Sequence, residues 1–167
     1  MQKLITKATF CSGVLLVFDL ELFSRELVLQ YSCYETFEHE ADIGIRGFGF
    51  SIEESFAFCA KAMFDLMRED IVAHSESEKV YIQAAGFDLE SLLVAWLNEL
   101  LTQADLYSIV FREFEIEISE LQLIAHAWGE YFVSGMDQGI EVKGATLAEA
   151  KVEQIENYWM SQCIVDV

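Results

Sequence analysis

Apolar residues recur at helical spacing in two stretches of the chain. One stretch follows Ser51-Ile52-Glu53-Glu54, which fits a capping box because a hydroxyl and a carboxylate lie three residues apart. Its apolar residues are Phe56, Cys59, Ala60, Met63, Phe64 and Met67. The stronger stretch follows Asp88, a good N-cap. Its apolar residues are Leu89, Leu92, Leu93, Trp96, Leu97, Leu100, Leu101 and Ala104. We therefore predict two amphipathic helices, each with an apolar stripe that faces a sheet.

Alternating apolar and polar residues predict strands around these helices. The alternation is clearest over residues 109–119, and residues 121–128 are predicted to form its hairpin partner. Further strands are predicted over residues 34–39, 43–50, 80–85, 140–145, 151–155 and 158–165. Two helices among many short strands indicate an α+β fold of two layers, with the helices packed on a mostly antiparallel or mixed sheet.

Residues 1–31 differ in character from the remainder. Lys3 and Lys7 precede an apolar stretch that resembles a signal peptide, but Asp19 and Glu21 interrupt it. The stretch has about ten residues, whereas a helix that spans a bilayer needs about 20. We expect an N-terminal extension, either an added strand or helix or a segment without a native role, followed by one folded domain over residues 32–167. No membrane association is expected.

The charge balance restricts the class of partner. The chain has 29 acidic and 10 basic residues, a formal net charge of −19, and no basic run. Nucleic-acid binding draws most of its affinity from lysine and arginine, so direct binding of RNA or DNA is not expected. An acidic surface suits a basic protein partner or a divalent cation; alternatively, it only keeps the protein soluble.

Cysteine and histidine spacing argues against a zinc site. The cysteines are Cys11, Cys33, Cys59 and Cys163, and the histidines are His39, His74 and His126. No two cysteines form a C-x-x-C pair, and the histidines are scattered. Free thiols suit a reducing compartment, so we expect a cytoplasmic protein. No phosphate-binding loop or nucleophile elbow is present, which lowers the expectation of an enzyme.

Two aspartates are candidates for cation binding. Asp42 begins a glycine-rich strand, and Asp166 directly follows an apolar strand, one residue before the α-carboxylate of Val167. Hard cations such as calcium and magnesium prefer clustered oxygen ligands. If the two strand ends meet, these oxygens form a cation site; otherwise each aspartate is a turn former or a solvated charge.

Four segments in the same order resemble the archease family over roughly residues 34–167. Residues 38–44 are similar to its H-x-A-D-I/M-G motif, and residues 88–101 to its second helix. Residues 141–146 resemble its V-K-A/G-x-T segment, and residues 163–167 its apolar ending on D-V or D-I.

The resemblance implies a function in tRNA splicing and RNA repair. A member of this family is a cytoplasmic α+β protein that catalyses no reaction itself. It is a metal-binding accessory protein that activates an RtcB-type RNA ligase, promoting guanylylation and multiple turnover of that ligase. The implied cofactor is one divalent cation, namely calcium, magnesium or manganese.

The family's functional positions carry over to four residues, and His39 is a further candidate. The resemblance implies that Asp42, Asp166 and Val167 are the metal ligands. It assigns Lys143 to a contact with the partner or a phosphate, although an ion pair with a nearby glutamate is an equal alternative. His39 is a candidate for orienting a metal ligand, and a hydrogen bond to the main chain is its structural alternative.

The chain departs from the family pattern at three places. Ala148 stands where many relatives have histidine, Glu40 stands where threonine or glutamine is common, and the loop over residues 131–139 is shorter than usual. Two other functions fit the residues themselves. One is a small metal-dependent phosphohydrolase that uses Asp42 and Asp166 to activate water. The other is a chaperone-like interaction module that needs no metal.

Overall fold

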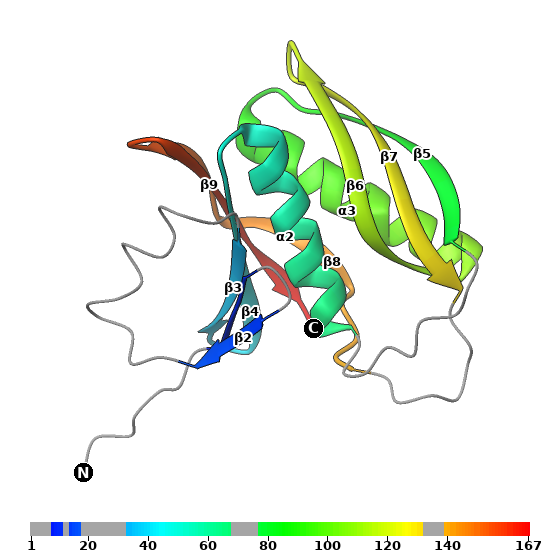
Figure 1. Ribbon diagram of the computed structural model, residues 1–167, viewed down its shortest axis with the longest axis horizontal. Helices are drawn as coiled ribbons and strands as arrows, with labels where there is room; N and C mark the ends of the chain where they lie inside the picture. The colour runs from blue at the N-terminus through cyan, green and yellow to red at the C-terminus, as the bar shows by residue number, and fades with distance from the viewer. Residues whose placement is uncertain (1–7, 12–13, 18–32, 68–76, 132–138) are drawn as a thin grey trace.

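The fold is α+β, as the sequence predicts (Figure 1). The computed structural model describes residues 8–11, 14–17, 33–67, 77–131 and 139–167. The helices in this part are α2 (Ile52–Leu66) and α3 (Leu89–Tyr107). The strands are β1 (Ala8–Cys11), β2 (Val14–Val17), β3 (Cys33–His39), β4 (Asp42–Gly49), β5 (Ser77–Ala85), β6 (Ile109–Ser119), β7 (Gln122–Tyr131), β8 (Gly144–Ile155) and β9 (Tyr158–Asp166). Neither described helix is long and apolar enough to cross a membrane.

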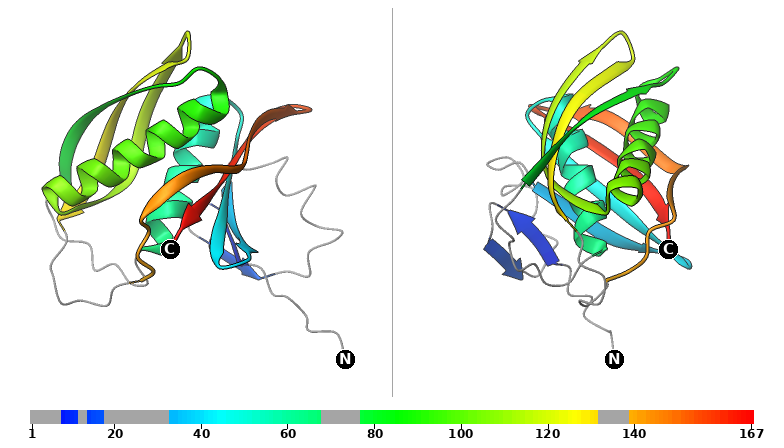
Figure 2. Two further views of the ribbon diagram at one scale, coloured as in Figure 1. Left: turned by 180° about the vertical axis from the view of Figure 1, so that it is seen from behind. Right: turned by 90° about the vertical axis from the view of Figure 1, so that its right-hand side faces the viewer.

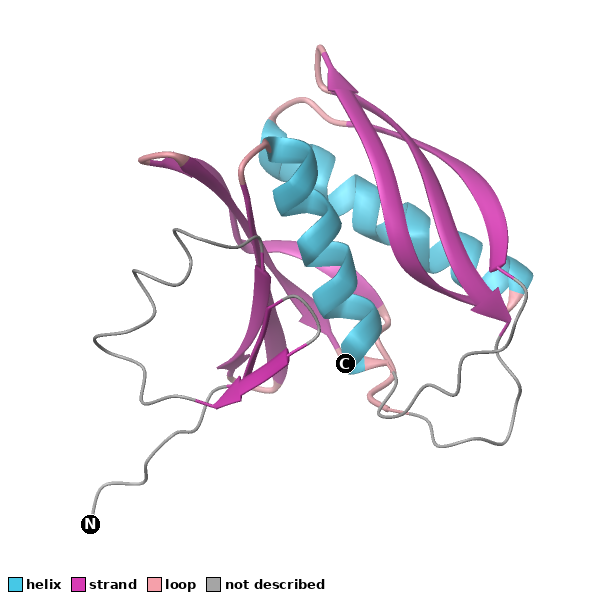
Figure 3. Cartoon of the chain, in the orientation of Figure 1, coloured by secondary structure: helices cyan, strands magenta, loops and turns pink. Residues whose placement is uncertain are grey.

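The strands form two antiparallel sheets rather than one. The larger sheet has the order β2-β1-β3-β4-β9-β8, and the smaller has the order β5-β7-β6. Both helices lie between the sheets, since α2 contacts β4 and β6 while α3 contacts β8 and β5 (Figures 2 and 3). The molecule therefore has three layers where we expected two. The physical reason is visible in α2, where consecutive residues Ala62, Met63 and Phe64 are all buried. Three consecutive positions span about 200° of a helix, so this helix needs cover on two sides.

Two short strands precede the domain and extend the larger sheet. β1 pairs with β2, and it also pairs with β3, where Thr9 lies opposite Glu35. The sequence leaves open whether residues 1–31 form an added strand or helix or have no native role. The described part of this segment forms an added pair of strands. Residues 18–32 lie outside the described part, and the boundary between extension and domain stays a prediction.

The predicted helix starts are confirmed, with one difference. The hydroxyl of Ser51 accepts a hydrogen bond from the Glu54 amide at 3.2 Å, but the Glu54 carboxylate accepts from the Phe50 amide at 2.7 Å instead of the Ser51 amide. At α3, Asp88 accepts from the Ser91 amide at 2.7 Å, and the Ser91 hydroxyl accepts from the Asp88 amide at 3.1 Å. Hydrogen bonds from Ser91 lower the pKa of Asp88.

The larger sheet packs on α2 with little space between the main chains. A Cβ atom on Gly47 would lie 2.3 Å from the main-chain oxygen of Ser55 and 2.5 Å from the amide nitrogen of Cys59. The Cys59 thiol is buried and donates to the main-chain oxygen of Ser161 at 2.9 Å. Burial raises the pKa of Cys59, and it raises the pKa of Cys163 to about 12. These cysteines are free thiols, as the sequence predicts, and burial keeps them in the unreactive protonated form.

β8 differs from its prediction. Residues 140–143 are not in a strand, although a strand over 140–145 was predicted. The segments predicted separately near 145 and over 151–155 belong to one strand. Its register with β9 shifts between Thr146 and Lys151, so the residues between them bulge away from the regular ladder. Periodicity alone cannot distinguish a bulge from a loop between two strands.

Candidate functional site

Asp42 and Asp166 lie at the same end of two neighbouring strands. The antiparallel pairing of β4 and β9 aligns Ile43 with Val165, so the next position outward aligns Asp42 with Asp166. Residues directly opposite each other in such a pair have Cα atoms about 4.5–5.5 Å apart and side chains on one face. The fold therefore brings together two aspartates that are far apart in the sequence, at the edge marked C in Figure 1.

A short turn places His39 beside Asp42. Glu40 and Ala41 connect β3 to β4, and His39 is the partner of Asp42 in the resulting pair. Glu40 has a φ of 50°, in the left-handed region that non-glycine residues adopt mainly in turns. Gly144 is the partner of Asp166 on the other side. One row across four strands therefore reads His39, Asp42, Asp166, Gly144.

Lys143 directly precedes β8 and lies at the same edge. Its amide donates a hydrogen bond to the main-chain oxygen of Asp166 at 2.8 Å, and its ammonium donates to the main-chain oxygen of Val167 at 2.9 Å. The alternative of an ion pair with a nearby glutamate is not found among the described residues. Lys143 is exposed to solvent.

Asn98 fixes β8 against α3, and the sequence reasoning missed it. Its side-chain amide donates to the Ala145 main-chain oxygen at 2.9 Å, and its carbonyl accepts from the Ala145 amide at 2.9 Å. The two bonds reproduce the pairing of a neighbouring strand. Ala145 directly follows the Lys143-Gly144 pair, so Asn98 positions both residues beside Asp166. The signal available in the sequence was a carboxamide within an otherwise apolar helix stretch.

The bulge of β8 supplies Glu149, a second residue that the sequence did not indicate. Its carboxylate lies 3.6 Å from Nε2 of His39, and its backbone adopts a φ of 48°. Nδ1 of His39 is buried and has no hydrogen-bond partner among the described residues. The alternative of a main-chain hydrogen bond to His39 is therefore not found in the described part. Glu149 adds a third carboxylate to the surroundings of the row.

The donor types at this edge suit a hard cation. Among the described residues, no group of three His, Cys, Asp or Glu side chains is arranged to hold a metal ion. The predicted set needs only two such side chains, Asp42 and Asp166, together with the oxygen of Val167. All of these donors are oxygen atoms, as calcium and magnesium prefer. The ammonium of Lys143 bonds to the same Val167 oxygen, so it would compete with a cation for that ligand.

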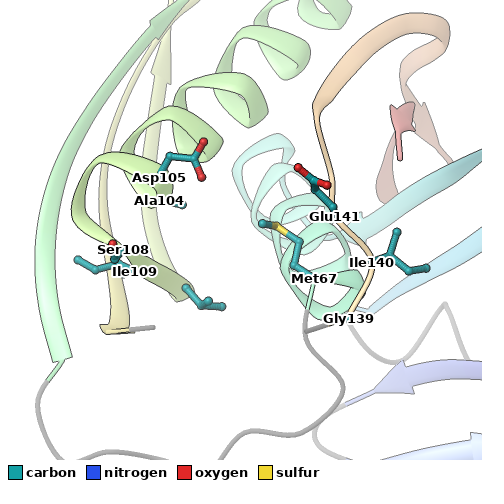
Figure 4. Close-up of a pocket in the computed structure, with 9 residues that line it drawn as sticks. Met67, Ala104, Asp105, Ser108, Ile109, Gly139, Ile140 and Glu141 are labelled. Carbon is teal, nitrogen blue, oxygen red and sulfur yellow. The ribbon is translucent and has the colours of Figure 1, made fainter. Parts of the chain in front are cut away.

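A separate cavity of about 360 Å³ lies between the C-terminal ends of α2 and α3 (Figure 4). Asp105 and Glu141 contribute its carboxylates. The other lining residues are Met67, Ala104, Ser108, Ile109, Val110, Gly139 and Ile140. None of the site residues predicted from the sequence lines this cavity, so it is distinct from the edge with the paired aspartates.

Comparison with known proteins identifies relatives over most of the chain. The model of the archease protein family matches residues 34–167. The archease of Pyrococcus abyssi is 38% identical over 140 residues, which cover 80% of this chain and 98% of that protein. The archease of Sulfurisphaera tokodaii is 38% identical over 138 residues, with the same coverage.

Solved structures agree with the fold. The solution structure of protein 1598 from Methanobacterium thermoautotrophicum matches with a TM-score of 0.67 and 32% identity, covering 80% of this chain and 98% of that one. A crystal structure from Thermotoga maritima, described as an archease and "possible chaperone", matches with a TM-score of 0.53 over 78% of this chain and 94% of that one. Its identity is 17%, so this second match supports the fold alone.

Proposed function

The chain belongs to the archease family, and on that premise we propose that it is a non-catalytic, metal-binding accessory protein that activates an RtcB-type RNA ligase. The proposed process is tRNA splicing and RNA repair, and the proposed location is the cytoplasm. The observation that carries the metal part of the proposal is the pairing of Ile43 with Val165, which places Asp42 and Asp166 at the next position outward on paired strands.

Two opposed carboxylates favour a bound cation. Asp42 and Asp166 are like charges at neighbouring positions, and a divalent cation between them would relieve their repulsion. When bound, calcium, magnesium or manganese would supply a localised positive charge at an edge the partner can reach, because Asp166 is exposed. His39 and Glu149 lie beside this pair and would orient it.

Lys143 is proposed to contact the partner or a phosphate. Its ammonium is held by the Val167 oxygen at 2.9 Å, next to the paired aspartates. A ligase that uses GTP presents phosphates, which a lysine ammonium binds as a point charge. The net charge of −19 supports a basic protein surface as the partner and argues against direct contact with RNA.

The test is ligation of a broken tRNA by the cognate ligase, with ligase limiting and GTP and a divalent metal supplied. We expect the wild-type chain to increase both guanylylated ligase and turnover number. Asp42→Asn and Asp166→Asn should lose most of this stimulation. The matched control is Glu156→Gln, which removes one exposed carboxylate at the opposite end of β9 and should stimulate like the wild type.

Three other results would contradict the proposal. Absence of stimulation by the wild-type chain would exclude the activator role. Stimulation that survives in both aspartate variants would favour a metal-independent, chaperone-like module. Hydrolysis of phosphate esters without ligase, abolished by Asp42→Asn, would favour a phosphohydrolase.

A further inference from the structure

The outer face of the smaller sheet carries an ordered set of aromatic and acidic side chains. Alternate residues of each strand point to one face of a sheet. Pairing across β5, β7 and β6 therefore defines three outward rows. The rows are Lys79–Trp128–Glu113, Tyr81–His126–Glu115 and Gln83–Ile124–Glu117. We call these nine residues the aromatic–acidic face.

Nothing in the described part of the chain covers this face. The alternate residues of the same strands, such as Ile82, Ala125 and Ala127, are buried against the helices. On the outer side, Tyr81 is 52% exposed and Ile124 is 43% exposed. Figure 1 shows this sheet on the far side of both helices from β9. The face is therefore separate from the paired aspartates.

Three neighbouring rings, Tyr81 of β5 and His126 and Trp128 of β7, form a ladder on this face. The ring centroids of Tyr81 and His126 are 5.7 Å apart, and those of His126 and Trp128 are 6.1 Å apart. The ammonium of Lys79 lies 4.9 Å from the Trp128 centroid. This intramolecular contact is a cation–π interaction, so the ladder already binds one positive side chain of its own.

A column of carboxylates runs along the ladder. Glu113, Glu115 and Glu117 occupy the outward positions of β6, and all three are exposed. Only Glu115 has a basic neighbour among the described residues, since Nδ1 of His126 lies 3.9 Å from its carboxylate. Three carboxylates against one lysine make the face negative, which repels nucleic acid and acidic proteins.

We propose that the aromatic–acidic face binds an extended, arginine-rich segment of a protein partner. A guanidinium can stack on an aromatic ring and donate hydrogen bonds to a carboxylate at the same time, which an ammonium cannot do as well. His126 and Trp128 of β7 lie on the strand adjacent to the glutamates of β6, about 4.8 Å apart. An arginine above the boundary between them can therefore reach both.

The spacing of the rows specifies the sequence pattern of the ligand. Successive glutamates of β6 are two residues apart, which is about 6.8 Å along an antiparallel strand. Alternate side chains of an extended peptide have the same repeat. A segment with arginine at every second position therefore places one arginine beside each of the three glutamates, whereas adjacent arginines point to opposite sides. In two of the rows that arginine can also stack on a ring of β7, Trp128 or His126, and in the third row Glu117 lies opposite Ile124.

The test uses two labelled synthetic peptides of equal charge in fluorescence anisotropy at physiological salt. In one, four arginines alternate with serines; in the other, four arginines precede four serines. We expect the full chain to bind the alternating peptide more tightly. The triple variant Glu113→Gln/Glu115→Gln/Glu117→Gln should weaken its binding about tenfold.

The matched control variant removes three exposed glutamates outside the face: Glu141→Gln/Glu153→Gln/Glu156→Gln. It has the same net charge as the first triple variant and should retain binding within about twofold, because distant exposed charges are screened. Trp128→Phe should retain binding, and Trp128→Leu should lose it. Circular dichroism establishes that each variant is folded.

Several results would overturn the inference. Equal losses in both triple variants would mean attraction by net charge alone. Equal affinity for the two peptides would refute the requirement for alternating arginines. Absence of binding by the wild-type chain would refute the proposed binding surface. The inference does not rest on the proposed metal site, so Asp42→Asn should bind the peptide normally even where it fails to stimulate ligation.

Discussion

Replacing Asn98 with alanine tests whether a side chain substitutes for a missing strand. β8 is at the edge of the larger sheet, so the main-chain groups that face away from β9 have no further strand to pair with. Asn98 satisfies both such groups of Ala145, at 2.9 Å each. Ala145 is only 7% exposed, so water is a poor replacement.

The expected loss in the free energy of unfolding follows from two lost hydrogen bonds. A hydrogen bond contributes about 1 kcal/mol net, and a buried polar group left without a partner costs about 1–3 kcal/mol. Partial access of water to the edge reduces this sum, so we expect Asn98→Ala to lower the free energy of unfolding by about 2–4 kcal/mol. With a urea m-value of about 2 kcal/mol/M, the unfolding midpoint should fall by about 1–2 M.

The assay is urea unfolding followed by circular dichroism, with Gln103→Ala as the matched control. Gln103 is a carboxamide on the same helix, and among the described residues its side chain bonds only to the Glu99 side chain, at 2.6 Å. Its removal should change stability by less than about 0.5 kcal/mol. If Asn98→Ala is as mild as this control, the Asn98 bonds to Ala145 contribute no stability and the reasoning fails.

Three other properties of the chain give further predictions. Gly47→Ala places a methyl group 2.3 Å from a main-chain oxygen of α2, so it should destabilise the fold by about 1–3 kcal/mol in the same urea assay. Bonds from Ser91 lower the pKa of Asp88 in the folded state, so their stabilising effect is complete above the unfolded pKa of about 4 and is lost as pH falls below it. Asp88→Asn should therefore lose less stability than the wild type between about pH 5 and pH 3. Burial raises the pKa values of Cys59 and Cys163, so neither thiol should react with iodoacetamide at pH 8 until the chain unfolds, as peptide mass mapping will report.

The elements of the fold were predictable because their signals are local. The periodicity after Asp88 and the capping residues Ser51 and Glu54 specify where the helices begin. The number of sheets was not predictable in the same way. Phe64 of α2 packs against Phe111 and Phe114 of the smaller sheet, and the periodicity of the helix does not show that distant strands supply this cover.

The candidate site shows the same contrast between local sequence signals and long-range packing. Asp42 and Asp166 could be identified by their places at strand ends, but their alignment depends on the register of β4 with β9. Register is a property of long-range pairing. Asn98 and Glu149 were missed because their roles depend on the edge position of β8 and on its bulge.

The place of β9 in the larger sheet has a consequence for biosynthesis. Along the chain, β9 comes after all the other described strands. In the larger sheet, however, it lies between β4 and β8. A growing chain on the ribosome can form the β3–β4 hairpin and α2 early, but it presents Asp42 without Asp166. Insertion of the last strand closes a contact of very high sequence separation, which is a slow step in folding. The acidic pair therefore forms only after β9 has inserted beside β4, and a copy without that pairing would lack the proposed cation site.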